Sequence, residues 1–145
     1  MDLGDYRRAS QEVWEAMAPG WERWRARLAD ALTPVREWLI RELAPQPAET
    51  VLELGAGTGE TGFEAAGIIG DDGRLISTDF SPGMVEVARR RGAELELGNV
   101  DYRVIDAERV VEELLAESPE VEAAGGSHTG LRRKGNEDAF TFGRI

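Results

Sequence analysis

The sequence has no cysteine, a single histidine and a single lysine among its 145 residues. The absence of cysteine excludes disulfide bonds, thiolate metal sites and a cysteine nucleophile. Long hydrophobic runs are also absent, because no stretch approaches the ~18 consecutive apolar residues of a transmembrane helix. Charged residues interrupt every hydrophobic run within residues 1–30. We therefore expect a soluble, cytoplasmic protein with no membrane partner.

Basic residues are scarce too, with 17 Lys and Arg against 28 Asp and Glu, which gives a formal net charge of −11. Proteins that bind nucleic acids neutralise phosphates with Lys and Arg, so this balance argues against a nucleic-acid partner. The chain is 41% hydrophobic. Its length and apolar content suit one domain with one core.

Residues 1–47 contain all four tryptophans and predict an N-terminal helical cap made of short helices. Pro19 and Gly20 interrupt the helical pattern, and Thr33 before Pro34 is a typical start of a further helix. The tryptophans recur at helical spacing, which we interpret as core packing rather than as an aromatic wall facing a ligand.

Residues 48–116 alternate between strand and helix patterns. Strands are predicted at 51–54, 74–78 and 101–105, and helices at 61–69, 82–91 and 108–116, with Gly92 ending the second helix. This order predicts an α/β fold with a partial parallel sheet of about three strands and right-handed crossovers. Residues 117–145 are expected to form a linker and a weakly ordered tail.

A glycine-rich segment at residues 55–62 follows the first predicted strand and opens a helix, the context in which such a motif binds a ligand. From Gly55 the pattern is G-x-G-x-G after an acidic residue. From Gly57 it is G-x-G-x-x-G, with Asp79 placed 22 residues later, as in a dinucleotide-binding protein. The pattern alone does not choose between the two.

Acidic residues end all three predicted strands, at Glu53, Asp79 and Asp106. A carboxylate at Glu53 would repel the pyrophosphate of a dinucleotide, whereas it suits the ammonium and sulfonium groups of S-adenosylmethionine. Asp79 can accept hydrogen bonds from both ribose hydroxyls, and Asp106 is placed to meet the adenine amine. Each could instead cap the helix that follows it. Together with the glycine loop, the set favours S-adenosylmethionine.

Three segments, at residues 51–59, 75–88 and 104–108, resemble class I S-adenosylmethionine-dependent methyltransferases, and most closely the small-molecule group that includes enzymes of ubiquinone and menaquinone biosynthesis. The resemblance implies a Rossmann-like methyltransferase fold. It implies that the first acidic residue and the glycines surround the methionine end, that Asp79 holds the ribose, and that Met84 packs near the adenine beside Asp106 and Ala107. The cofactor-binding positions expected on this basis are Glu53, Gly55, Ala56, Gly57, Gly59, Asp79, Phe80, Met84, Asp106 and Ala107.

After Arg109 the sequence departs from that family, because an amphipathic stretch at 110–115 replaces the expected fourth strand and acceptor-binding loop. The tail at 129–140 instead resembles the first motif of metal-dependent protein phosphatases of the 2C type. That resemblance implies a phosphate contact for Arg133 and metal binding for Glu137 and Asp138. The later metal ligands of that family are missing, so we expect neither a working phosphatase nor a metal site.

These observations predict a truncated S-adenosylmethionine-dependent methyltransferase with weak or no turnover by itself and an unidentified small-molecule acceptor. A gene fusion or truncation would account for the two resemblances. Two alternatives stay open. One is a non-catalytic module that associates through an open sheet edge. The other is a fragment of a nicotinamide-dependent oxidoreductase, which the G-x-G-x-x-G pattern from Gly57 would indicate.

Overall fold

The computed structural model describes residues 2–107, 109 and 141–144. Its elements, in chain order, are α1 (Leu3–Leu43), β1 (Thr50–Leu54), α2 (Glu60–Ile69), β2 (Arg74–Asp79), α3 (Pro82–Glu94), β3 (Val100–Val104) and β4 (Thr141–Arg144). The helix expected at 108–116, apart from Arg109, and the phosphatase-like motif at 129–140 lie outside the described residues. The division of the chain at 47/48 and 116/117 stays a prediction.

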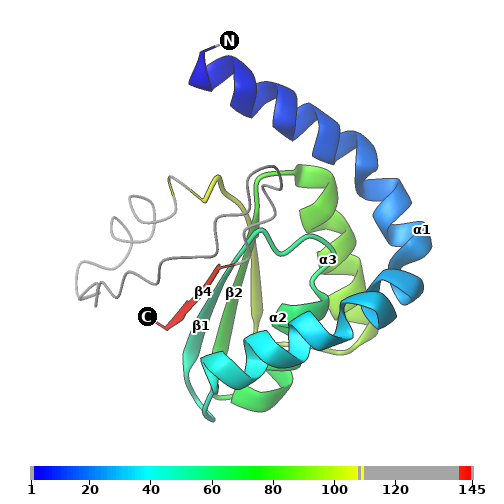
Figure 1. The fold of residues 1–145 in the computed structure, drawn as a ribbon. Coiled ribbons are helices and arrows are strands. Elements are labelled where there is room, and N and C mark those ends of the chain that lie inside the picture. The colour runs from blue at the N-terminus through cyan, green and yellow to red at the C-terminus, as the bar shows by residue number, and fades with distance from the viewer. Residues whose placement is uncertain (1, 108, 110–140, 145) are drawn as a thin grey trace.

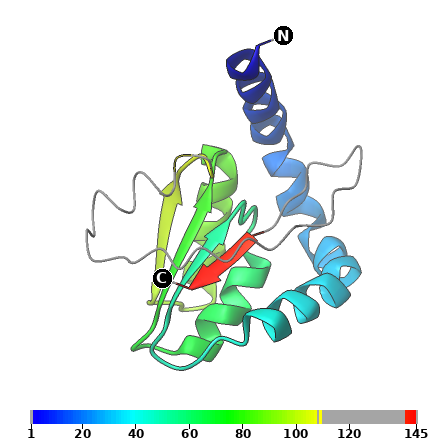
Figure 2. The same cartoon turned by 60° about the vertical axis from the view of Figure 1, so that its left-hand side comes forward.

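The strands form one sheet in the order β3-β2-β1-β4 (Figure 1). β1 pairs with β2, and β2 with β3, in parallel, while β4 runs antiparallel beside β1. The predicted α/β fold with three parallel strands is therefore confirmed. Figure 2 shows β4 lying along the outer side of β1, an edge that the prediction left open.

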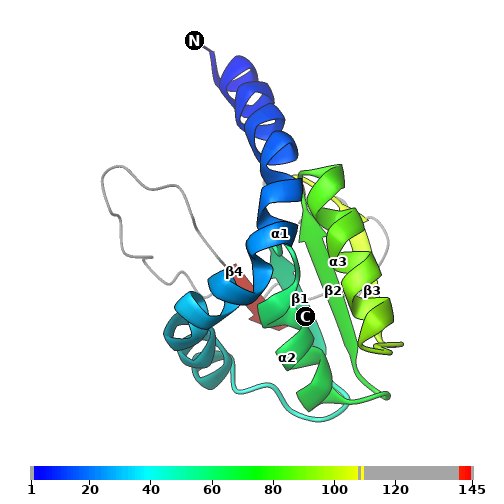
Figure 3. The same cartoon turned by 90° about the vertical axis from the view of Figure 1, so that its right-hand side faces the viewer.

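The three helices lie on the same face of the sheet (Figure 3). This face carries the larger core cluster, in which Val51 and Leu75 from the strands pack against Ala65, Ala66 and Ile69 of α2. Alternate residues of the same strands, Leu52, Leu54 and Ile76, point the other way, and they form a smaller cluster with Ile105, which follows β3. The strand alternation thus sets both faces.

The N-terminal region is one helix of 41 residues with Pro19 and Pro34 inside it, so the prediction of separate short helices was wrong. A proline removes one backbone N–H and crowds the preceding turn, which bends a helix but need not end it. Figure 3 shows α1 changing direction along its length as it wraps around α2 and α3. Thr33 is not a cap either, since its hydroxyl donates to the carbonyl of Ala29 one turn earlier, at 2.9 Å.

The prediction that the tryptophans pack in the core is also wrong for two of them, because Trp24 and Trp38 are 52% and 49% exposed. Trp14 and Trp21 are half-buried and pair with each other at 6.1 Å between ring centroids. The helix attaches through Ile40 and Leu43, which pack against the larger core cluster, and through arginine–glutamate pairs that reach α2 and α3. These pairs are Arg25–Glu60, Arg36–Glu64 and Glu22–Arg90.

The helix after β2 extends beyond the predicted stop, because α3 continues past Gly92 to Glu94. Gly92 serves packing instead, since a Cβ at this position would overlap the Tyr102 hydroxyl on β3. The start of α3 matches the prediction: Pro82 is the first helical residue, and the Ser81 side chain accepts from the amide of Met84. No helix of the described residues is long and apolar enough to cross a membrane.

Candidate cofactor site

Two loops meet at the carboxyl edge of the sheet. Leu54 and Thr78 are partners in the β1–β2 register, so the glycine loop after β1 lies beside the loop that follows β2. The amide of Ala56 donates to the carbonyl of Thr78 at 2.9 Å and joins the two. The carboxyl edge of a parallel sheet is where open α/β folds bind their ligands.

The glycines of the first loop fall into two groups. Gly55, Gly57 and Gly59 all have positive φ, at 67°, 55° and 91°, which favours glycine over other residues. A Cβ at Gly55 or Gly57 would meet no atom within 4 Å, so both open onto free space. A Cβ at Gly59 would overlap the Phe63 ring of α2. The first two glycines therefore leave room for a ligand, and the third allows close helix packing.

Asp79 connects the two loops. Its carboxylate accepts from the amide of Gly57 at 2.9 Å through one oxygen and from the amide of Ser81 at 2.9 Å through the other. The residue is 7% exposed. Burial raises the pKa of Asp79, and the hydrogen bonds from these amides oppose that rise. A carboxylate held in this way is fixed in orientation and keeps lone pairs for a further donor.

Glu53 lies beneath the glycine loop rather than on its surface and is 2% exposed. Its carboxyl accepts from the amide of Gly62 at 2.9 Å and from the Ser77 hydroxyl at 3.3 Å. A Cβ at Gly62 would overlap this carboxyl, so the glycine makes room for it. Burial, opposed by these hydrogen bonds, raises the pKa of Glu53 to about 8. Near neutral pH the group is therefore mostly protonated, which weakens the electrostatic argument against a dinucleotide.

The other expected positions lie around the same edge. Phe80 is half-buried in the loop after β2, and Met84 is buried in the first turns of α3. Beyond β3, Asp106 is half-buried and Ala107 exposed, and the carbonyl of Asp106 accepts from the amide of Arg109 at 2.8 Å. The structure thus brings the ends of β1, β2 and β3 together, while their roles toward a ligand stay predictions.

Two residues of α1 that the sequence reasoning missed also reach this edge. Gln11 donates to the carbonyl of Phe80 at 2.7 Å. Glu15 accepts from the Ser81 hydroxyl at 2.6 Å and from the amide of Gly83 at 2.8 Å. The two residues are four positions apart, so they lie on one face of the helix. This spacing was the only signal in the sequence, and it does not indicate that the loop after β2 is their partner.

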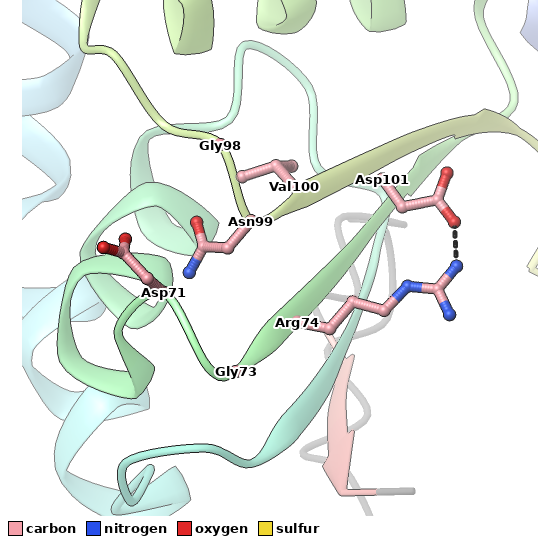
Figure 4. Close-up of a pocket in the computed structure, with 7 residues that line it drawn as sticks. All are labelled: Asp71, Gly73, Arg74, Gly98, Asn99, Val100 and Asp101. Carbon is pink, nitrogen blue, oxygen red and sulfur yellow. Dashed lines mark hydrogen bonds and ion pairs between the residues drawn. The ribbon is translucent and has the colours of Figure 1, made fainter.

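The opposite edge of the sheet has a polar hollow of about 330 Å³ near the starts of β2 and β3 (Figure 4). Arg74 and Asp101 form an ion pair at its rim. The hollow lies at the amino ends of the strands, away from the glycine loop, and we assign it no role. Among residues 2–107, 109 and 141–144, no group of acidic or histidine side chains could hold a metal ion.

The sequence family described as "Methyltransferase domain" matches residues 45–120, which include the glycine loop and Asp79. The chain belongs to this methyltransferase family. Aklanonic acid methyltransferase DauC from Streptomyces sp. (strain C5) is 38% identical over 76 residues, which cover 52% of this chain and 34% of DauC. Ubiquinone/menaquinone biosynthesis C-methyltransferase UbiE from Teredinibacter turnerae is 33% identical over 74 residues, covering 50% and 30%.

Among solved structures, a putative rRNA-methylase from Clostridium thermocellum matches with a TM-score of 0.50 at 17% identity, covering 56% of this chain and 43% of that one. This likeness concerns the fold. The family match and the similarity to UbiE confirm the predicted resemblance to class I methyltransferases. The similar solved structures include one described as a SAM dependent methyltransferase from Aquifex aeolicus, with a TM-score of 0.45 at 25% identity, covering 49% of this chain and 38% of that one. The chain spans about a third of the length of DauC and UbiE.

Proposed function

We propose that the chain binds S-adenosylmethionine at the carboxyl edge of the sheet, between the glycine loop and the loop after β2. The observation that carries this proposal is Asp79, whose carboxylate is fixed by amides of both loops at 2.9 Å. Gly55 and Gly57 leave open space beside it, as close approach of a ligand to the backbone requires. The residues present therefore fit the cofactor.

In this proposal each residue group has a separate task. Asp79 accepts hydrogen bonds from the ribose hydroxyls, while Phe80, Met84, Asp106 and Ala107 bound the adenine. Ala56 and the glycines approach the methionine end through their backbone, and Glu53 holds the first turn of α2, directly after the loop, through the amide of Gly62. The cofactor supplies an electrophilic methyl group on a sulfonium, and the protein contributes mainly position and orientation.

The proposed methyl acceptor is a small organic molecule. The similar proteins DauC and UbiE are named for aklanonic acid and for ubiquinone and menaquinone biosynthesis, which supports this class of acceptor. The net charge of −11 disfavours a nucleic-acid acceptor. Whether the chain turns over by itself is tested by incubating it with the labelled cofactor and a panel of small aromatic and quinone acceptors.

Binding is tested by isothermal titration with S-adenosylhomocysteine, the demethylated product. We expect binding to the wild type, and the substitution Asp79→Ala should weaken it by about 1–3 kcal/mol through lost hydrogen bonds to a charged group. Asp72→Ala is the matched control, since Asp72 is an exposed carboxylate in the turn before β2. Equal affinities of all three proteins would contradict the assigned role of Asp79.

We also propose self-association through a sheet edge, and the structure limits which strands can form that edge. Within the described residues, β4 pairs with the outer side of β1, and β3 is the other outermost strand of the sheet. A further copy would therefore add to β3 or β4. Sedimentation velocity over a range of concentrations tests this: a rising sedimentation coefficient supports it, and a constant monomer value overturns it.

A further inference from the structure

The loop that follows Asp79 is attached to α1 by three hydrogen bonds. Gln11 donates to the carbonyl of Phe80 at 2.7 Å, the Ser81 hydroxyl donates to Glu15 at 2.6 Å, and the amide of Gly83 donates to Glu15 at 2.8 Å. The sequence separations are 66 to 69 residues, so these are tertiary contacts. They tie the N-terminal helix to one wall of the proposed cofactor site.

Ser81 is the junction of this arrangement, because each of its polar groups has a different partner. Its backbone amide donates to one oxygen of Asp79 at 2.9 Å, while its hydroxyl donates to Glu15 at 2.6 Å. Ser81 is fully buried, so water does not readily replace either partner. A continuous chain of hydrogen bonds therefore runs from Glu15 through Ser81 to Asp79, and from Asp79 to the amide of Gly57.

Gly83 shows how closely the Glu15 carboxylate approaches the loop. A Cβ on Gly83 would lie 2.8 Å from one carboxylate oxygen of Glu15 and 3.1 Å from the other. Glycine at this position leaves the space that the carboxylate fills. The hydrogen bonds from Ser81 and Gly83 also hold the pKa of Glu15 below its ordinary value, so the group is a carboxylate at neutral pH.

We propose that Glu15 is a positioning residue for Asp79, so that docking of α1 sets the affinity for the adenosyl part of the cofactor. Glu15 holds the Ser81 hydroxyl, and the Ser81 backbone in turn orients the carboxylate that accepts the ribose hydroxyls. This inference rests on the proposed function. It adds that α1 is energetically coupled to the cofactor site although no hydrogen bond joins Glu15 directly to Asp79.

The test compares four variants with the wild type by isothermal titration with S-adenosylhomocysteine. Glu15→Ala removes both hydrogen bonds and should weaken binding about two- to thirtyfold. Glu15→Gln keeps an acceptor oxygen and should recover most of the affinity. Glu12→Ala removes an exposed carboxylate one turn earlier on α1, so it matches the charge change and should bind as the wild type does.

Gly83→Ala perturbs the same contact from the other side. Its Cβ displaces the Glu15 carboxylate, while alanine is a better helix former than glycine. We expect weaker binding together with an unchanged or higher thermal unfolding midpoint. A substitution that acts only by destabilising the fold would instead lower the unfolding midpoint together with the affinity.

The pathway through Asp79 is tested in an Asp79→Asn background. If Glu15 acts by orienting that carboxylate, Glu15→Ala should have much less effect on affinity there than in the wild type. If the wild type binds S-adenosylhomocysteine and the variants Glu15→Ala and Gly83→Ala bind it with the same affinity, the inference about Glu15 is overturned. The proposed function would then stand. Absence of binding by the folded wild type overturns the proposed function itself.

Discussion

The side chain of Glu53 is buried beneath the glycine loop, an environment that disfavours its charged form. Its pKa is raised from 4.5 to about 8 by burial, against the hydrogen bonds from Ser77 and Gly62. At pH values between 4.5 and about 8, the Glu53 carboxyl has lost its proton in the unfolded chain and keeps it in the folded chain. Stability therefore falls as the pH rises through this window, by at most about 1.4 kcal/mol per pH unit from this group.

The variant Glu53→Gln should remove this pH dependence. Glutamine keeps an acceptor for the Gly62 amide and carries no titrating proton, so its urea midpoint should decline less than that of the wild type between pH about 5 and about 9. Urea unfolding across this range provides the measurement. Parallel declines of the two proteins would contradict the raised pKa.

At the residue scale, local motifs were predictable and their surroundings were not. The glycine loop and Asp79 follow strands directly, so chain order alone places them at the same sheet edge. The direction of the Glu53 side chain depends on α2, where Gly62 provides the space for it. Glu15 depends on a contact 66 residues away in the chain, and no local pattern encodes such a partner.

The packing of α3 on β3 depends on Gly92, since a Cβ there would overlap the Tyr102 hydroxyl. Gly92→Ala should cost about 1–3 kcal/mol of stability through overpacking. That hydroxyl is buried and has no hydrogen-bond partner within the described part of the chain, so Tyr102→Phe should cost little. In the phenylalanine background the alanine should be much better tolerated.

Chemical unfolding of the two single variants and the double variant measures this coupling. Gly67→Ala is the control, because Gly67 is an exposed position of α2 with open space around it. It should raise stability by up to about 1 kcal/mol through helix propensity. Additive effects of Gly92→Ala and Tyr102→Phe would show that the hydroxyl does not cause the overlap.

Element types were predicted well and element ends poorly. The strands and helices between residues 50 and 104 agree with the sequence patterns to within a few residues. The sequence pattern predicts a helix interruption at Pro19, a helix start at Pro34 and a helix end at Gly92, yet all three residues lie inside helices. Each of these helices packs along α2, α3 or β3 over many residues, and such tertiary contacts outweigh a local propensity cost of ~1–3 kcal/mol.

At the scale of the whole molecule, helices cover one face of the sheet (Figure 3). The proposed site occupies the carboxyl edge of the sheet, where Asp79 ends β2. The site joins residues of α1, β1, β2 and α3, so it exists only in the folded chain, and the ligand binds the folded and not the unfolded state. Bound ligand should therefore raise the stability of the whole domain, by about 2.7 kcal/mol at a free concentration of 100 Kd. Thermal unfolding with increasing S-adenosylhomocysteine measures this shift, and an unfolding midpoint independent of ligand concentration would contradict it.

The sheet edge around Asp79 is the proposed binding site for S-adenosylmethionine. The most direct test of this proposal is isothermal titration of the folded wild type with S-adenosylhomocysteine, with NADH titrated in parallel. We expect saturable binding of S-adenosylhomocysteine that Asp79→Ala weakens by about 1–3 kcal/mol, and no binding of NADH. No heat with S-adenosylhomocysteine, or preferential binding of NADH, would contradict the proposal.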